Sequence, residues 1–300
     1  MRLVGVFSRR EPSSVKLLDS STPVYAMADI EQYQDDVDVM ILCGGSKSDL
    51  PEQGPYLAKF FNTVDSFDTH AKVPEYYAAL DQSARDAGRV ALLSVGWDPG
   101  LFSINRLYGE AILPEGETYT FWGKGLSQGH SDAVRRVPGV KSGVQYTLPS
   151  EEAIARVRSG EQPELTTREK HKRECYVVLE DGAEADVVRE SIVTMPDYFA
   201  DFDTTVNFID QTTFEKEHSS MPHGGFVIRS GKTGTDSTQT IEYSLALGSN
   251  PEFTASVLVA YARAVYRLAR VNDIGAKTVF DIAPGLLSPK SPAQLRKELL

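Results

Sequence analysis

Cysteine is scarce in this chain of 300 residues, which contains only Cys43 and Cys175, far apart and outside any CxxC pattern. Two isolated cysteines exclude a disulfide framework and a cysteine-based zinc site. Long apolar runs are also missing. None approaches the roughly 18 residues of a membrane-spanning helix, and the N-terminal stretch has no signal-peptide cleavage site. We therefore expect a cytoplasmic protein without a membrane partner.

Positive charge is in deficit as well. Asp and Glu number 42 against 31 Lys and Arg, which gives a formal net charge of -11. Because nucleic-acid binding requires clustered Lys and Arg, we expect no nucleic-acid partner. Histidines are few, and His218 and His223, five positions apart, do not form a convincing metal pair, so we expect no metal site. The remaining composition is that of a globular protein large enough for two domains.

The first hundred residues alternate between apolar runs and helical patterns. Strands are expected at residues 3–7, 63–68 and 90–95, and residues 37–46 are expected to form a strand that runs into a turn of small residues. Helices are expected around residues 57–61, 73–87 and 101–112. Strands that alternate with helices of this length predict βαβ units and a largely parallel sheet. We therefore expect an α/β fold for this part of the chain.

After about residue 115 the pattern changes to alternating strands interrupted by short helices, which predicts an α+β domain with a mixed sheet. A long, largely apolar helix is expected at residues 250–271, because Asn250 and Pro251 form a favourable helix start. A last strand at residues 278–282 and a helix at 291–300 are expected to return to the first domain. The strands expected in the second region are residues 118–122, 140–148, 174–179, 204–209, 225–229 and 238–247, and the helices are residues 151–157 and 186–193.

A buried strand at residues 90–95 runs into Gly96-Trp97-Asp98-Pro99-Gly100 and then directly into a helical pattern. The carboxyl ends of strands in open α/β sheets are where ligands bind, and this turn places Trp97 and Asp98 there. Asp68 ends another strand of the same sheet. Two converging carboxylates can bind an ammonium group, pair with a metal or serve as acid and base, but no His or Cys accompanies them at the spacing of metal ligands. The alternative is that each is only a turn or helix-capping residue.

The first strand ends in Ser8-Arg9-Arg10, without the acidic residue that selects NAD. A hydroxyl and two guanidinium groups at this place suit the 2′-phosphate of NADP, although an exposed basic turn is the simpler alternative. Cys43-Gly44-Gly45-Ser46 follows the second strand and would let the backbone approach a ligand, but Gly-Gly is also an ordinary turn.

The segment from Trp122 to Asp132 is rich in glycine and in hydrogen-bonding side chains, a composition typical of functional loops. His130 within it is either a general base or, more simply, a hydrogen-bonding group at a helix end. Arg173 lies where an apolar strand begins, so it could face a carboxylate. His223, in a later turn, could donate to an anion.

Taken together, these segments resemble the meso-diaminopimelate dehydrogenase family, NADP-dependent D-amino-acid oxidoreductases of bacterial lysine biosynthesis. The likeness extends in order over essentially the whole chain. It rests on Phe7-Ser8-Arg9-Arg10, Pro51-Glu52-Gln53, Val64-Asp65-Ser66-Phe67-Asp68, the segment Gly96 to Arg106, Phe121-Trp122-Gly123, Gly129-His130-Ser131-Asp132, Val144 to Ser150, His171-Lys172-Arg173, Met195 to Phe199, Met221-Pro222-His223-Gly224-Gly225 and Asn250-Pro251.

The resemblance implies a homodimer that oxidises the D-centre of meso-2,6-diaminopimelate with NADP and water, giving L-2-amino-6-oxopimelate, ammonia and NADPH. It implies a Rossmann-like dinucleotide-binding domain in residues 1–97 with 276–300, and a substrate-binding and dimerisation domain in residues 98–275. The catalytic residues would be Asp68 and Asp98, which hold the ammonium group of the D-centre. The implied substrate-binding residues are Trp97, Trp122, Ser127, Gln128, Gly129, Thr147, Arg173, His223 and Asn250, of which the last four hold the L-centre. The implied cofactor-binding residues are Ser8, Arg9, Arg10, Cys43, Gly44, Ser46, Ser66 and Phe67.

The strand, Gly-x-Gly-x-x-Gly turn and helix with which the family begins are absent from this sequence. In a sheet ordered 3-2-1-4-5-6 that strand is central, and the turn holds the pyrophosphate at a helix N-terminus. Our hypothesis is an N-terminally shortened chain that folds less stably and binds NADP weakly or not at all. Two alternatives stay open: a cofactor-deficient dimeric protein that only binds diaminopimelate, and a related NADP-dependent D-amino-acid dehydrogenase.

Overall fold

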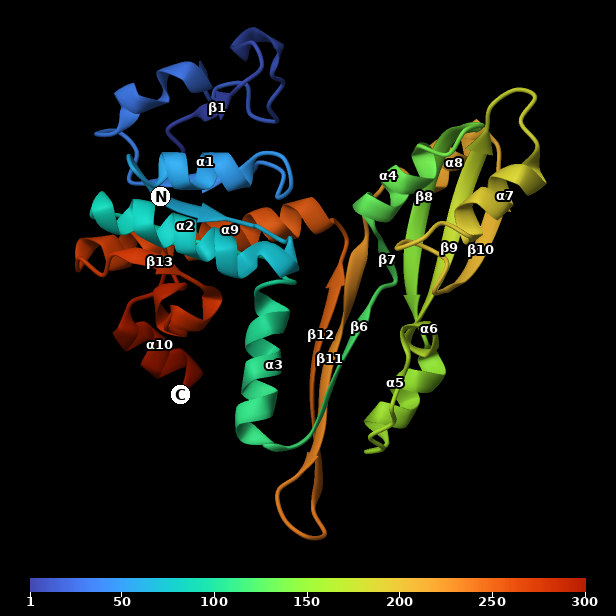
Figure 1. Cartoon of the computed structure of the whole chain (residues 1–300). Helices are drawn as coiled ribbons and strands as arrows, with labels where there is room; N and C mark the ends of the chain where they lie inside the picture. Colours follow the sequence, from blue (N-terminus) through green and yellow to red (C-terminus); the bar gives the residue numbers. More distant parts are fainter. The chain divides into compact units, whose positions relative to one another are not determined.

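The computed structural model describes all of residues 1–300 and divides them into two compact units (Figure 1). The first unit comprises Met1–Ile104 and Thr254–Leu300, and the second comprises Asn105–Phe253. The expected boundaries were at residues 97 and 276, so residues 98–104 and 254–275 lie in the first unit instead. The reason is visible in the long helix α9 (Asn250–Arg270), whose Arg263 and Arg267 donate to the backbone carbonyls of Leu287 and Leu286.

The first unit contains parallel sheets, as the alternation of strands and helices predicts. Four parallel strands lie in the order β13-β5-β4-β3, and β1 and β2 form a separate parallel pair, so β1 and β3 are both edge strands. The strands are β1 (Val6–Ser8), β2 (Val24–Ala26), β3 (Val39–Leu42), β4 (Asn62–Asp65), β5 (Val90–Leu92) and β13 (Gly275–Lys277). The helices are α1 (Leu50–Leu57), α2 (Val73–Asp86) and α10 (Pro292–Leu299), together with short 3₁₀ turns at Pro12–Ser14, Met27–Tyr33, His70–Lys72, Val279–Asp281 and Pro284–Leu286.

Helix α2 shows why these residues fold as they do. Tyr76, Leu80 and Ala84 recur at four-residue spacing and are all buried, whereas the intervening positions are mostly exposed. Two expectations were wrong in this unit. The helix expected at residues 57–61 lies earlier in the chain: it is α1, which begins at Leu50 and ends at Leu57. The strand expected at residues 278–282 is a 3₁₀ turn, because the Thr278 and Asp281 side chains cap its backbone N–H groups locally.

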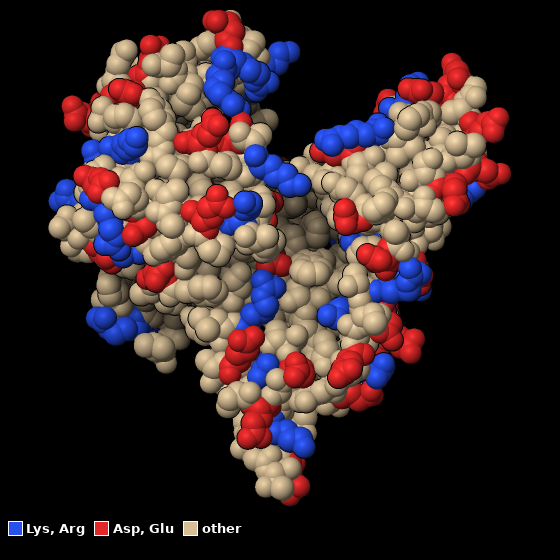
Figure 2. Space-filling model, viewed as in Figure 1, with Lys and Arg blue, Asp and Glu red and all other residues tan.

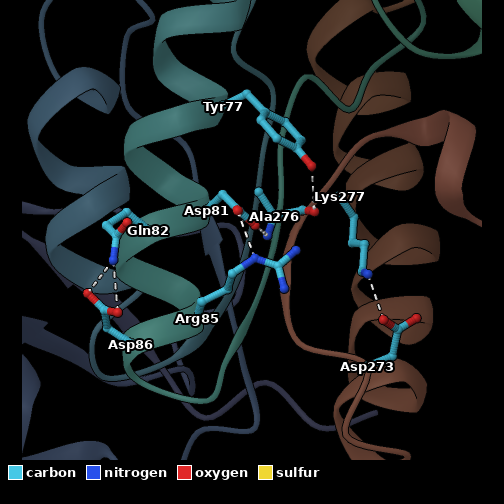
Figure 3. Close-up of polar contacts among 8 residues, drawn as sticks. All are labelled: Tyr77, Asp81, Gln82, Arg85, Asp86, Asp273, Ala276 and Lys277. Carbon is cyan, nitrogen blue, oxygen red and sulfur yellow. Dashed lines mark hydrogen bonds and ion pairs between the residues drawn. The ribbon is translucent and has the colours of Figure 1, made fainter.

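The strand β13 joins the C-terminal segment to α2 (Figure 3). The Asp81 carboxylate accepts a hydrogen bond of 2.8 Å from the Ala276 N–H, and the Tyr77 hydroxyl donates to the Ala276 carbonyl at 3.3 Å. Arg85 holds the second oxygen of Asp81 at 2.8 Å. Because the strand also pairs with β5 in parallel, the C-terminal segment belongs to the same sheet as the first hundred residues.

The second unit contains two sheets and confirms the expected mixture of strand directions. One sheet is antiparallel in the order β12-β11-β6; the other has the order β10-β9-β8-β7, with β10 parallel to β9 and the remaining pairs antiparallel. The strands are β6 (Glu115–Trp122), β7 (Gly125–Leu126), β8 (Val140–Pro149), β9 (His171–Leu179), β10 (Asp203–Phe208), β11 (His223–Lys232) and β12 (Thr238–Leu247). The helices are α4 (Gln128–Arg135), α5 (Glu151–Arg158), α6 (Thr167–Lys170), α7 (Ala185–Val193) and α8 (Gln211–Glu217), and α3 (Leu101–Ile112) begins in the first unit and ends in this one.

Arg229 closes the C-terminal end of α3. Its guanidinium group is buried and donates to the carbonyls of Leu113 and Pro114 and to the Thr118 hydroxyl at 3.0 to 3.1 Å. The last carbonyls of a helix have no partner within the helix, and cations interact favourably there. Arg229 therefore fixes the connection between α3 and β6.

Acidic and basic side chains both occur on the face of the molecule drawn in Figure 2. They are interspersed over most of this face, and a small group of Lys and Arg side chains lies together near the top of the view. None of the helices combines the length and the apolar character needed to cross a membrane. No group of three or more His, Cys, Asp or Glu side chains is arranged to hold a metal ion.

Candidate active site

The residues expected to bind a cofactor lie at the carboxyl ends of strands in the first unit. Ser8 ends β1, Cys43 follows β3 and Ser66 follows β4. Contacts join these turns: Arg9 forms a 2.7 Å ion pair with Asp49, whose other oxygen accepts from the Gly45 N–H at 2.8 Å. The fold therefore brings the basic turn and the Gly-Gly turn together.

The basic turn has a compact shape. The Arg10 N–H donates to the Ser8 hydroxyl at 3.0 Å, and both arginine side chains are exposed. Asp49 was not identified from the sequence, because nothing in the local pattern distinguishes it from an ordinary helix-start residue. It supplies the link between Arg9 and the Gly-Gly turn.

The loop after β4 carries Ser66, Phe67 and Asp68. The Asp68 N–H donates to the Ser46 hydroxyl at 3.0 Å, which connects this loop to the segment after β3. The Phe67 side chain is buried and stacks on Tyr76 with ring centroids 4.2 Å apart. Phe67 can therefore face a cofactor only through its backbone, while the exposed Asp68 can reach a ligand with its carboxylate.

The second carboxylate, Asp98, lies in a tight turn between β5 and α3. Trp97 forms an isolated backbone bridge with Gly100, whose φ of +133° is open only to glycine. Trp97 itself is buried and packs edge-on against Phe102 at 5.3 Å. The turn thus holds a partly buried Asp98 at the carboxyl end of a parallel strand.

Asp65 is a buried carboxylate to which the sequence pattern assigns no role. It ends β4 and is fully shielded from solvent. Burial raises the pKa of Asp65 to about 6, although hydrogen bonds from the Tyr76 hydroxyl and from the Phe67 and Ser94 N–H groups oppose the increase. Burial and the neighbouring carboxylate also raise the pKa of the Tyr76 hydroxyl.

In the second unit, Trp122 is held by His171. The Nε2 atom of His171 accepts a 2.8 Å hydrogen bond from the Trp122 N–H, and the two rings stack with centroids 5.3 Å apart. Burial, with help from the positive charges of Arg173 and Lys170, lowers the pKa of His171 to about 4. His171 is thus neutral near pH 7, as an acceptor at Nε2 requires. His171 belongs to one of the motifs found in the sequence. Its contact with Trp122, 49 positions away in the chain, could not be predicted from the sequence.

The loop after Trp122 is fixed through its backbone. The Gly123 N–H donates to the Gly224 carbonyl and the Leu126 N–H to the Pro222 carbonyl, both at 2.9 Å. The Ser127 N–H donates to the Gln145 carbonyl at 3.1 Å. These bonds present the expected Ser127, Gln128 and Gly129 at the start of α4, where Gln128 and Gly129 are exposed.

His130 stands in the first turn of α4. Its Nδ1 atom is 2.8 Å from the Ser127 hydroxyl, and its ring contacts Tyr198 and Phe199 edge-on. Burial and the positive charge of Arg173 lower the pKa of His130 to about 4. These contacts favour the interpretation of His130 as a hydrogen-bonding group at a helix start over a general base that works near pH 7.

Thr147 and Arg173 face each other on β8 and β9, where the strand register pairs them. Arg173 donates to the Thr147 hydroxyl, and its guanidinium group lies 3.9 Å from the ring centroid of Phe202. The arginine is only 9% exposed, its Nε atom has no hydrogen-bond partner, and no carboxylate of the chain forms an ion pair with it. Burial lowers the pKa of Arg173 to about 10, so it is still a cation at neutral pH.

His223 and Asn250 lie near this pair. Gly125 pairs with Thr147 across β7 and β8, and His223 packs directly over Gly125. The Asn250 N–H donates to the Met221 carbonyl at 3.0 Å, which places the start of α9 beside the segment that leads to His223. The side-chain amide of Gln128 contacts the Met221 sulfur at 3.3 Å. The second unit therefore gathers the residues expected at the L-centre.

Comparison with known proteins identifies the family of the chain. The family model "Diaminopimelic acid dehydrogenase C-terminal domain" matches residues 96–249. The meso-diaminopimelate D-dehydrogenase of Lysinibacillus sphaericus is 65% identical over 300 residues, which cover 100% of this chain and 92% of that protein.

Solved structures of related enzymes superpose over nearly the whole chain. The DAP dehydrogenase of Corynebacterium glutamicum in complex with DAP matches with a TM-score of 0.91 and 50% identity, covering 100% of this chain and 92% of the other. A sextuple mutant of the Clostridium tetani enzyme with DAP gives 0.92 and 53%, covering 99% and 91%. An engineered D-amino acid dehydrogenase bound to NADP⁺ gives 0.85 and 48%, covering 100% and 92%. The chain belongs to the meso-diaminopimelate dehydrogenase family.

Proposed function

We propose that this chain catalyses the NADP-dependent oxidative deamination of the D-centre of meso-2,6-diaminopimelate to L-2-amino-6-oxopimelate. The observation that carries the proposal is Arg173, a buried cation without a carboxylate partner in the chain. Burying an unpaired charge is costly, so such a group is expected where a ligand supplies the opposite charge. A carboxylate of the substrate supplies that charge, and Thr147 and His223 add hydrogen bonds.

The substitutions in the related Clostridium tetani mutant support this assignment. That protein was changed at a Gln, a Thr, an Arg, a Pro, a His and an Asn, and its structure was solved with DAP. The same six residue types occur here in the same order and with the same spacing along the chain. They are Gln128, Thr147, Arg173, Pro222, His223 and Asn250.

The substrate carries two carboxylates and two ammonium groups, so it needs both basic and acidic partners. We assign Thr147, Arg173, His223 and Asn250 to the L-centre, which does not react. Asp68 and Asp98 hold the ammonium group of the D-centre. We assign Trp97, Trp122, Ser127, Gln128 and Gly129 to the binding of the same centre.

The chemistry requires mainly orientation and charge matching. When bound, NADP accepts a hydride from the α-carbon of the D-centre. Before the hydride leaves, the D-centre ammonium group gives up one proton to solvent. Loss of the hydride from the resulting amine then leaves an iminium ion, whose positive charge the carboxylates of Asp68 and Asp98 stabilise. Addition of water to this iminium carbon and release of ammonia then leave the ketone.

The residues of the first unit fit NADP. The exposed guanidinium groups of Arg9 and Arg10 suit a dianionic 2′-phosphate, and the Ser8 hydroxyl lies in the same turn. The other expected contacts, Cys43, Gly44, Ser46, Ser66 and the Phe67 backbone, follow the carboxyl ends of β3 and β4, where dinucleotides bind in open α/β sheets. The related engineered enzyme holds NADP⁺. Titration with NADPH tests this site, and an affinity that Arg9→Ala and Arg10→Ala leave unchanged would contradict the assignment.

We also propose that the protein is a cytoplasmic homodimer. Exposed apolar side chains on α3, Leu107, Tyr108 and Ile112, and the unpaired edge of β12 are surfaces that a second copy could cover. Light scattering in solution tests this: a mass of one chain at micromolar concentration would contradict it.

The decisive assay follows NADP reduction optically with meso-diaminopimelate and with the L,L isomer, which has no D-centre. We expect turnover with the meso isomer alone. Arg173→Met should lower kcat/KM for meso-diaminopimelate by about 100-fold or more, since an ion-paired hydrogen bond to the substrate carboxylate is lost. Arg168→Met is the matched control, because Arg168 is exposed and contacts only Asp203, through an ion pair, and the Ala200 carbonyl, through a hydrogen bond. Equal effects of the two changes would contradict the proposed carboxylate site.

A further inference from the structure

Asp65 lies at the centre of a buried hydrogen-bond network between β4, β5 and α2. One carboxylate oxygen accepts from the Phe67 N–H at 2.9 Å and from the Ser94 N–H at 3.2 Å. The other accepts from the Tyr76 hydroxyl at 2.7 Å. The backbone carbonyl of Asp65 accepts from the Val95 N–H at 2.8 Å. Every oxygen of this residue therefore has a partner in the protein, and none faces solvent.

The two N–H groups that one oxygen binds belong to two different loops. Phe67 immediately precedes Asp68, and Ser94 begins the segment that leads to Asp98. Asp65 thus connects the loop of one proposed catalytic carboxylate to the loop of the other. No other side chain bonds to the backbone N–H groups of both segments.

Tyr76 fixes the position of the Asp65 carboxylate. Its ring stacks on Phe67, and its hydroxyl packs so closely on Gly54 that a Cβ atom at that position would overlap it. The hydroxyl is therefore held between α1 and the end of β4. A carboxylate that accepts from a fixed donor has little freedom to turn.

Ser94 has a strained backbone conformation that its hydrogen bond to Asp65 stabilises. Its φ is +57°, in the left-handed region that residues other than glycine rarely adopt. It is buried, and its hydroxyl has no hydrogen-bond partner, so the side chain does not stabilise this conformation. The hydrogen bond from the Ser94 N–H to Asp65 stabilises this conformation, because that bond requires the Ser94 N–H to point at the carboxylate.

We propose that Asp65 is a positioning residue that holds the loops of Asp68 and Asp98 in the relative position needed for substrate binding. The proposal rests on the proposed function, because it takes Asp68 and Asp98 as the partners of the substrate ammonium group. Asp65 is shielded from any ligand and acts only through the two loops. A residue that merely stabilised the fold would not affect substrate affinity separately from stability.

The test compares Asp65→Leu, which removes the acceptors but keeps the branched arrangement of side-chain atoms, with Asp65→Asn, whose carbonyl oxygen can still accept from both N–H groups. Amide hydrogen exchange reports on the Phe67 and Ser94 N–H groups, and calorimetry measures the affinity for meso-diaminopimelate in the full chain. We expect Asp65→Leu to speed exchange of both amides and to weaken binding, each by about 10-fold or more. Asp65→Asn should stay within about 3-fold of the parent.

Two further variants identify the route of the effect. Ser94→Gly removes the backbone strain, so Asp65→Leu combined with Ser94→Gly should recover most of the lost affinity. Tyr76→Phe removes only the hydroxyl and should weaken binding by about 3-fold, which keeps the test available if Asp65→Leu does not fold. Unchanged affinity in both Asp65→Leu and Tyr76→Phe, or equal losses in the Leu and Asn variants without recovery by Ser94→Gly, would overturn the proposal.

Asp98→Asn, measured in parallel, separates this inference from the function on which it rests. If Asp98→Asn leaves the affinity for meso-diaminopimelate unchanged, the proposed substrate site is wrong and the role of Asp65 falls with it. If Asp98→Asn weakens binding and Asp65→Leu does not, only the positioning role is refuted.

Discussion

The contact between His171 and Trp122 makes the second unit sensitive to acid. His171 is 3% exposed, and its pKa of about 4 lies below the ordinary value of 6.5. The folded state therefore resists a proton that the unfolded chain accepts, so the stabilisation present above pH 6.5 is lost as the pH falls towards 4. The difference of about 2.5 between the two pKa values corresponds to about 3 kcal/mol.

Two other buried groups decide whether the folded state gains or loses stability overall as the pH falls. His130 acts in the same direction as His171, because its pKa is also lowered to about 4, although it is less buried. Asp65 acts in the opposite direction. Its pKa is raised from 3.8 to about 6, so the stability it contributes is complete below pH 3.8 and is lost as the pH rises through 6, which amounts to about 3 kcal/mol. The two histidines outweigh the aspartate, and both lie in the second unit.

The perturbation is His171→Gln, and the assay is denaturant unfolding at pH 7.5 and pH 5. At pH 7.5 the variant should be less stable by about 1 to 3 kcal/mol, because the stacked ring is lost from a buried position. Between pH 7.5 and pH 5, however, it should lose about 2 kcal/mol less stability than the parent, since the titrating group is gone. The exposed His70→Gln variant is the control. An identical pH dependence in His171→Gln and the parent would refute the reasoning.

Three further outcomes follow from single contacts. Arg229→Met should lower the free energy of unfolding by about 2 to 4 kcal/mol, measured by denaturant titration, because the buried carbonyls after α3 lose their donor. Asp65→Asn should unfold at a higher temperature than the parent above pH 7 and lose this advantage near pH 4, since a neutral amide replaces a buried charge; calorimetry at the two pH values measures this. Gly125→Ala should weaken binding of meso-diaminopimelate about 10-fold by calorimetry, because the added methyl group displaces His223, whereas Gly234→Ala, which meets no neighbouring atom, should have no effect.

The local pattern of apolar residues predicted most of the secondary structure. The helical spacing of Tyr76, Leu80 and Ala84 and the fully buried β4 and β5 strands were readable, because burial of one face or of a whole strand dictates the residue types there. One error lies where local side-chain hydrogen bonds compete with the apolar pattern. Thr278 and Asp281 cap a 3₁₀ turn at residues that read as a strand.

The sequence by itself determined the alternation of strands and helices, the family and the residue types suited to a doubly charged amino acid, since each depends on the order of residues along the chain. The tertiary structure alone decided that Arg173 meets Thr147 without a carboxylate, that His171 holds the Trp122 backbone and that Asp65 joins two loops. These contacts link strands and loops distant in the chain, and sequence spacing carries no information about which buried donor meets which acceptor. Their energies arise from burial, which exists only once the sheets have formed.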